Sequence, residues 1–335
     1  MRAPATFYSK ANQASQGRSG SSVFVDRMLQ GVYDMQPIVR CSSADALAEY
    51  LKIVVSRKHS SMVGILCKIF RTTMTKLQQS KTERTSNRGQ SIEAGVHGSL
   101  LAVSTLLACT DGFMVPRFEE VCDVILNLFD SDITLVQLEL YRLLPQLAAT
   151  CRHSFGRRYL KRSLSFLLDS AQRQTLRESQ LDIRPQAYSA IGGLVMALVD
   201  SKTGSVFGGS NEPMMIIQRE FPGEIFELNP RGVVFEEMDH IFAVMKLGIR
   251  NDPSETPTRC LIHEHALVST ADLASAFKSE SRHYLSLLLY DLFEFGLSES
   301  LVYCLTSICR ALPEMKAKID GLILVAVSQR LTDVT

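Results

Sequence analysis

A histidine pair is the first group of residues in this 335-residue chain whose types and spacing could do chemistry. The run Ile262-His263-Glu264-His265 places two imidazoles two positions apart. On a helix such positions point about 200° apart, so the pair could share a metal ion only on a strand, where a third ligand is not evident. The alternatives are an enzyme that uses His263 and His265 or a solvated loop, and the spacing favours the loop.

The glycine-rich stretch Gly204–Gly209 and the eight cysteines could in principle form a nucleotide site and a zinc site. The stretch, GSVFGG, lacks the Gly-Lys-Ser/Thr that cradles a phosphate, and no strong strand precedes it. The cysteines form no Cys-x-x-Cys pair, and several lie at apolar helical positions, so buried free thiols are expected. The sequence also has neither the HRD nor the DFG motif of protein kinases. We therefore predict no catalytic site, no metal and no cofactor.

A basic cluster follows the apolar run LLPQL, and it gathers the cations Arg152, Arg157, Arg158, Lys161 and Arg162. Cations in the first turn of a helix oppose the helix dipole, which makes their presence at a predicted helix start unusual. One interpretation is a solvated helix start, and the other is a contact edge for an acidic protein partner. We take these five residues as the candidate protein contacts.

The overall composition argues against a nucleic-acid surface and a membrane span. Lys and Arg total 36 against 35 Asp and Glu, for a net charge of +1, and only 7% of residues are aromatic. A nucleic-acid surface normally needs a strongly basic face. The longest apolar run, Gly321–Val327, is far shorter than the roughly 18 residues that a spanning helix needs. The composition therefore predicts neither a nucleic-acid partner nor a membrane-spanning segment.

Two matching helical signatures, 168 residues apart, indicate how these groups are positioned. Leu135–Leu147 reads LVQLELYRLLPQL, and Tyr303–Met315 reads YCLTSICRALPEM. The separation is about four units of 42 residues, within the range of HEAT and armadillo repeats. Because a single helix pair cannot bury its own apolar face, such repeats stack. We predict an all-α fold, a HEAT-type α-solenoid of antiparallel helix pairs. Gly192-Gly193, inside a helical pattern, indicates close approach of a neighbouring helix.

The pattern divides the chain into four parts. Residues 1–42 are polar and Ser-rich and are expected to form a disordered or loosely ordered leader. Residues 43–200 carry the first part of the repeat array, and residues 266–335 carry the second part. Residues 201–265 contain many Gly and Pro and are expected to form an irregular connection with one helix.

Four segments, in the same order as in the family, resemble the N-terminal HEAT region of target of rapamycin (TOR) kinases, Ser/Thr kinases related to phosphatidylinositol-3-kinase. Ser91–Leu107 contains His97-Gly98 and Leu100-Leu101, which match the family's I-H-G-A-L-L core. The other segments are Phe118–Ala149, Arg184–Val199 and Leu273–Ile323. The last contains the most specific matches: Gly296-Leu297-Ser298, Leu312-Pro313, Lys316, Ile319 and Gly321-Leu322.

The resemblance implies a scaffold segment of a Ser/Thr kinase in growth and nutrient signalling. It implies binding to Raptor-like or Rictor-like subunits, and contact with a second TOR copy is a further possibility that it raises. The family's catalytic region lies outside the segments that match, so no catalytic residue is carried over. The expected location is the cytoplasm, with recruitment to endomembranes; the acid-poor N-terminus leaves mitochondrial targeting as an alternative. The alternative function is an unrelated HEAT or armadillo adaptor in transport or trafficking.

Overall fold

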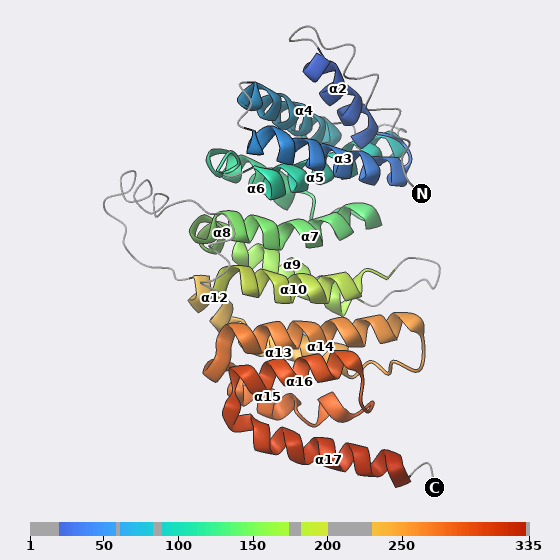
Figure 1. The fold of residues 1–335 in the computed structure, drawn as a ribbon, viewed down its shortest axis with the longest axis vertical. Coiled ribbons are helices and arrows are strands. Elements are labelled where there is room, and N and C mark those ends of the chain that lie inside the picture. The colour runs from blue at the N-terminus through green and yellow to red at the C-terminus, as the bar shows by residue number, and fades with distance from the viewer. Residues whose placement is uncertain are drawn as a thin grey trace, which may run out of the picture. The chain divides into compact units, whose positions relative to one another are not determined.

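A computed structural model describes residues 20–57, 61–82, 89–110, 112–173, 182–199 and 230–332. Of the residues in these ranges 85% are helical, and no strand occurs among them. The predicted all-α fold is confirmed. The helices divide into two compact units, Met1–Glu139 and Leu140–Thr335, and the division falls within α7 (Thr134–Thr150). Figure 1 labels the helices of both units.

The first unit is organised around α5 (Gly89–Cys109), because its side chains are buried on several sides. The residues Leu100, Ala102, Val103 and Leu106 are fully buried. The helices around α5 are α2 (Gly20–Val32), α3 (Pro37–Ser56) and α4 (Met62–Thr82), and the short η2 (Val115–Arg117) and α6 (Phe118–Leu126) follow it in the chain.

One segment of α5, Ile92–Cys109, is long and apolar enough to cross a membrane by length and composition. It is packed inside the first unit, where 72% of the segment is buried. A central core helix has the same composition, so the segment is weak evidence for a membrane span.

A buried arginine joins the turn after α2 to α5. Arg40 is only 1% exposed, and its Nε donates to His97 Nδ1 at 2.9 Å. Its Nη1 donates to the carbonyl oxygens of Asp34 and Met35, at 3.0 and 3.1 Å, and its Nη2 lies 3.9 Å from Glu93 Oε1. A buried guanidinium is tolerated only when such partners replace water, so His97 fixes where α3 meets α5.

The glycine next to His97 allows α2 and α5 to approach closely. A Cβ at Gly98 would lie 2.1 Å from the carbonyl oxygen of Val32, which is a backbone atom that cannot give way. The His97-Gly98 pair is therefore explained by packing: His97 holds Arg40, and Gly98 leaves room for the end of α2.

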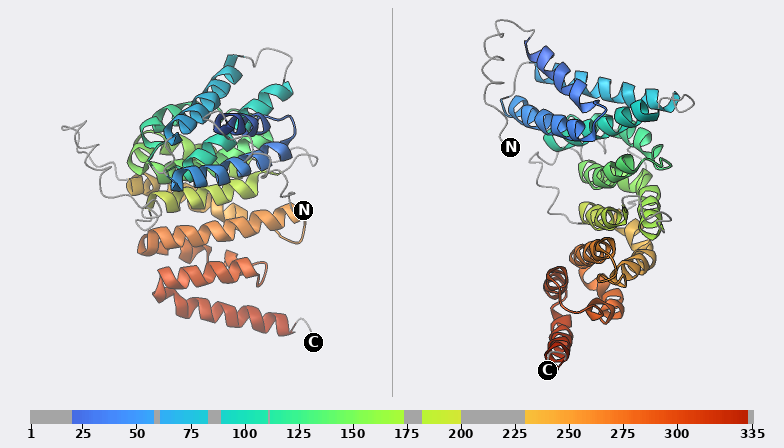
Figure 2. Two further views of the ribbon diagram at one scale, coloured as in Figure 1. Left: turned by 45° about the horizontal axis from the view of Figure 1, so that its top comes forward. Right: turned by 90° about the vertical axis from the view of Figure 1, so that its right-hand side faces the viewer.

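The second unit contains the remainder of α7 and two layers of helices. Within it, α10, α14 and α16 pack in succession as one layer, and α9, α13 and α15 lie behind them (Figures 1 and 2). This stacking is consistent with the predicted HEAT-type arrangement. The elements are α8 (Arg152–Arg158), α9 (Leu160–Gln172), α10 (Arg184–Val199), α12 (Pro230–Glu236), α13 (Met238–Ile249), α14 (Pro257–Phe277), η4 (Lys278–Ser281), α15 (Arg282–Leu288), η5 (Asp291–Phe293), α16 (Glu299–Ala311), η6 (Pro313–Met315) and α17 (Lys316–Thr332).

Helices α10 and α14 approach each other closely at Gly192. A Cβ at Gly192 would lie 3.0 Å from the Cα of Ser269 and 2.9 Å from Asp272 Oδ2. Ser269 Oγ donates to the carbonyl oxygen of Tyr188 at 2.6 Å, which adds a buried hydrogen bond between the two helices. The interpretation of Gly192-Gly193 as a packing feature therefore agrees with the structure for Gly192. At Gly193 there is more room, because a Cβ added there would lie 3.4 Å from Cγ of Pro145.

Two predicted loosely structured parts contain more helix than expected. Within residues 1–42, α2 covers Gly20–Val32 and α3 begins at Pro37, because Val25, Leu29 and Val32 form a buried stripe despite the Ser-rich composition. Within residues 201–265, α12 and α13 are helical and α14 begins at Pro257, so one helix was too few.

The prolines explain the second error. Pro257 stands at the first position of α14, after Thr256, whose Oγ1 accepts a hydrogen bond from the backbone N–H of Arg259 at 3.2 Å. Pro230 likewise opens α12. At the first helical position the missing N–H of proline has no intrahelical partner to lose, so these prolines begin helices.

The two matched proline signatures differ in local structure. Pro145 lies inside α7, whereas Pro313 follows the end of α16 and opens η6. Both signatures nevertheless bury the leucine before the proline, Leu144 and Leu312. The sequence similarity therefore marks equivalent packing positions and does not extend to the course of the backbone.

Two glycines in α5 test the close approach of α2 and α5. We expect Gly98→Ala to destabilise the protein by about 2–3 kcal/mol, because the new methyl group meets backbone. The matched control is Gly95→Ala, since no atom lies within 4 Å of a Cβ there; it should stabilise by about 0.5–1 kcal/mol through helix propensity. Urea unfolding followed by circular dichroism measures both, and equal effects would contradict this account.

Candidate protein-contact surface

The basic cluster lies on α8 and α9 of the second unit. These helices are separated only at Tyr159, and their inward positions carry Phe155, Tyr159, Leu160 and Leu164, all buried. The outward positions carry four exposed cations: Arg157, Arg158, Lys161 and Arg162. Arg157 and Arg158 end α8, and Lys161 and Arg162 lie in the first turn of α9. We call these four residues the basic edge.

Arg152 does not share that exposure. It begins α8, is half-buried, and has a buried Nε. The structure therefore brings together four of the five predicted contact residues on one exposed edge and places the fifth partly inside.

The position of α8 depends on a contact with α12. A Cβ at Gly156 would lie 2.7 Å from Cβ and Cγ of Pro230, so only glycine lets the two helices meet. The guanidinium of Arg158 lies 5.7 Å from the centre of the Tyr159 ring. Arginine presents a planar fork of donors that matches a carboxylate in two hydrogen bonds, so this edge is suited to an acidic protein surface.

The histidine pair lies on α14 and does not form a shared site. His263 is buried, its Nδ1 lies 2.7 Å from the carbonyl oxygen of Ile249, and its ring meets Phe295 edge-on at 5.5 Å. His265 instead forms a hydrogen bond with Ser189 on α10, and burial lowers its pKa. The expected loop at these residues is wrong, because both imidazoles are held between packed helices.

No metal cluster of three or more His, Cys, Asp or Glu occurs among the described residues. All eight cysteines are free thiols, and burial raises the pKa of Cys304 to about 12. A thiol with so high a pKa is protonated at neutral pH and is a poor nucleophile. The glycine-rich stretch Gly204–Gly209 lies outside the described residues.

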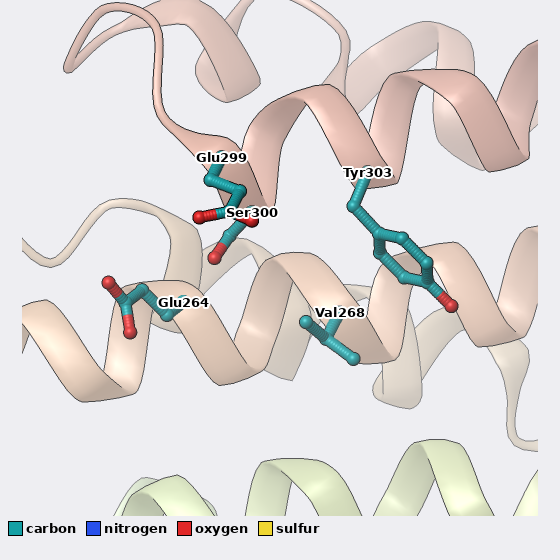
Figure 3. A pocket seen from close by; sticks show the side chains of 5 residues that line it. All are labelled: Glu264, Val268, Glu299, Ser300 and Tyr303. Atoms are coloured by element: carbon teal, nitrogen blue, oxygen red, sulfur yellow. The ribbon is translucent and has the colours of Figure 1, made fainter.

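A groove between α14 and α16 is a second candidate surface that the sequence did not indicate. Figure 3 shows it lined by Glu264 and Val268 from α14 and by Glu299, Ser300 and Tyr303 from α16. Its volume is about 440 Å³ and it opens widely to solvent. Glu264 and Val268 are one helical turn apart, as are Glu299 and Tyr303, which is the only pattern that could have suggested the two lining faces.

A partly buried carboxyl group lies further along α14. Asp272 faces Gly192 of α10, and burial raises the pKa of its carboxyl to about 6. No salt bridge among the described residues involves it. A carboxylate in this position loses water without gaining a cation, so the group destabilises the fold whenever it is ionised.

Three known proteins are similar to part of this chain. The serine/threonine-protein kinase TOR of Arabidopsis thaliana is 30% identical over 145 residues, and that of Oryza sativa subsp. japonica is 29% identical over 145 residues; each covers 43% of the chain. The serine/threonine-protein kinase tor1 of Schizosaccharomyces pombe is 27% identical over 168 residues, 50% of the chain. No family model matches the chain.

The chain is similar to TOR kinases. The resemblance is confirmed over about half of the chain. The matches span only 5–6% of the length of the relatives, in their non-kinase portions. The similarity therefore concerns a TOR-related helical region, and what TOR kinases do as whole proteins enters below as a proposal.

Asp272 provides a test of the electrostatics of α14. Because its folded pKa is above the ordinary 3.8, the folded state binds the proton more tightly than the unfolded state. Stability should thus fall as pH rises from about 4 to about 6 and then stay level. Asp272→Asn should stabilise the protein at pH 7.5 by about 1–2 kcal/mol, after allowance for partial exposure.

Urea unfolding at pH 7.5 and pH 4.0 measures the stabilisation by Asp272→Asn, which should nearly vanish at the lower pH. Asp320→Asn on α17 is the control, since Asp320 is exposed and its replacement should change stability little at either pH. An Asp272→Asn protein that is less stable than the wild type at pH 7.5 would show that the carboxylate has a stabilising partner.

Proposed function

We propose that this chain is a helical scaffold segment of a TOR-like Ser/Thr kinase assembly. In this proposal it binds a Raptor-like or Rictor-like subunit and supports assembly of the complex in growth and nutrient signalling. The observation that carries the proposal is the similarity to three TOR kinases over up to half of the chain. Kinase activity towards Ser and Thr would belong to the larger protein, and the setting would be the cytoplasm, with recruitment to endomembranes.

The stacked helices support a binding role. Layered helical repeats expose long faces whose residues are held by packing on both sides, and such faces bind proteins over extended areas. In the second unit, α8 and α9 hold the basic edge through the buried residues Phe155, Leu160 and Leu164. We infer that the basic edge meets an acidic surface of the partner.

Purified partner subunits test the proposal directly. The chain should bind an immobilised Raptor-like or Rictor-like subunit from the same organism in biolayer interferometry. Binding to neither subunit, by a chain with a normal helical circular dichroism spectrum and cooperative unfolding, would count against the TOR assembly. It would favour instead an unrelated adaptor.

Charge reversal tests the basic edge. The triple variant Arg157→Glu, Arg158→Glu and Lys161→Glu should weaken subunit binding about tenfold, mainly through slower association. The wild-type affinity should also fall with added salt, and this dependence should decrease in the variant. Stability should change little, because all three side chains are exposed.

The matched control makes the same change in charge on other helices. Arg310→Glu, Lys316→Glu and Lys318→Glu alter exposed residues of α16 and α17. Equal weakening by both triple variants would indicate a general charge effect, and unchanged binding by the basic-edge variant would remove these residues from the interface. Loss of the folded state would show that they are structural.

A further inference from the structure

The groove between α14 and α16 combines apolar and acidic groups on one surface. Figure 3 shows Tyr303 and Val268 facing the groove at one end and the carboxylates of Glu264 and Glu299 at the other. The two helices pack against each other, and both carry buried residues, among them Leu301, Cys304 and Ile308 of α16 and Leu267 of α14. The lining side chains therefore project from two packed helices.

The groove carries negative charge that no cation among the described residues pairs with. No salt bridge among the described residues involves Glu264 or Glu299, and Glu264 only accepts a weak hydrogen bond from Cys260 Sγ at 3.6 Å. Elsewhere in the second unit acids do pair. Asp291 binds Lys246 and Arg250, at 3.2 and 2.7 Å. The two groove acids thus remain available to a cation from outside.

The apolar part of the groove is also uncovered. Tyr303 is 50% exposed and Val302, beside it on α16, is 55% exposed. Single exposed apolar residues are common, but here an exposed aromatic ring stands beside Val268 in a concave site. Tyrosine in such a position is a frequent anchor of protein interfaces, because it provides a large contact area at low entropic cost.

We propose that the groove between α14 and α16 binds a segment of a partner protein in which an arginine or lysine stands next to an apolar side chain. The cation lies between Glu264 and Glu299, and the apolar side chain lies against Tyr303 and Val268. A guanidinium suits this site best, because it can donate to both carboxylates while its aliphatic stem covers the tyrosine ring.

The shape and charge of the groove favour such a segment over other occupants. An anionic ligand would be repelled by both carboxylates. A small apolar ligand would stay largely in water, because the groove is open, whereas small-molecule pockets bury most of their ligand. An extended or helical segment can bridge the acidic and the apolar end at once.

A labelled probe peptide tests the proposal with the full chain. We would use a fluorescein-labelled peptide of ten alternating Arg and Leu residues and measure its binding by fluorescence anisotropy. The double variant Glu264→Gln and Glu299→Gln should weaken binding about fivefold to tenfold. Tyr303→Ala should weaken it severalfold, while Tyr303→Phe should bind like the wild type, since the ring provides the apolar contact.

The control double variant, Glu236→Gln and Glu294→Gln, removes two exposed acids elsewhere in the second unit. Unchanged binding by the control, with weakened binding by the groove variants, supports the site. Equal weakening by both pairs, full binding by the Glu264 and Glu299 variant, or equal binding of a peptide that alternates Glu and Leu would overturn it.

The probe experiment on the groove and the binding experiment with partner subunits can succeed or fail independently. The groove variants leave Arg157, Arg158 and Lys161 in place, so failure of the probe experiment does not affect the basic edge. Conversely, a groove that binds the probe would remain a binding site even if no Raptor-like or Rictor-like subunit bound the chain.

Discussion

The close contact of α10 with α14 is the constraint on which the second unit depends. At Gly192 the helices are too near for a side chain, and Ser269 joins them through the carbonyl oxygen of Tyr188. This contact sets the position of α14, and α14 in turn supports α16. The groove between α14 and α16 exists because α10 holds α14 and α14 holds α16. The proposed binding surface therefore follows from a packing requirement.

Much of the fold could be predicted from the sequence, because long helices with a 3.6-residue period leave a clear pattern. Gly192-Gly193 indicated close helix contact for the same reason that the structure shows: a helix tolerates glycine when a neighbour needs the space. The one helix predicted in residues 201–265 corresponds to α13, whereas α12 and the first part of α14 were missed, because Pro230 and Pro257 begin helices there. A proline in the sequence can mark either the start of a helix or a break in it. At Pro257 the capping residue Thr256 indicates a start.

The candidate surfaces were predictable to different degrees. The basic edge consists of residues close together in sequence, so it could be predicted directly, although the half-buried Arg152 shows that sequence proximity alone does not decide exposure. The groove joins Glu264 to Glu299 across two helices, and no local pattern reports which faces of two separate helices meet. The same holds for Arg40 and His97, whose hydrogen bond joins residues 57 positions apart.

The acids of α14 illustrate how binding and stability compete. Glu264 lies in the groove without a cation, and two turns further Asp272 is held between helices with its carboxyl pKa raised by burial to about 6. An uncharged residue at Asp272 would lower the electrostatic cost of folding, because the carboxyl faces Gly192 of α10 and no salt bridge among the described residues involves it. Glu264 differs, because it lines a groove that is open to solvent. A carboxylate without a cation is useful where one arrives from another molecule, so binding explains Glu264 in our proposal, whereas Asp272 only lowers the stability of the fold.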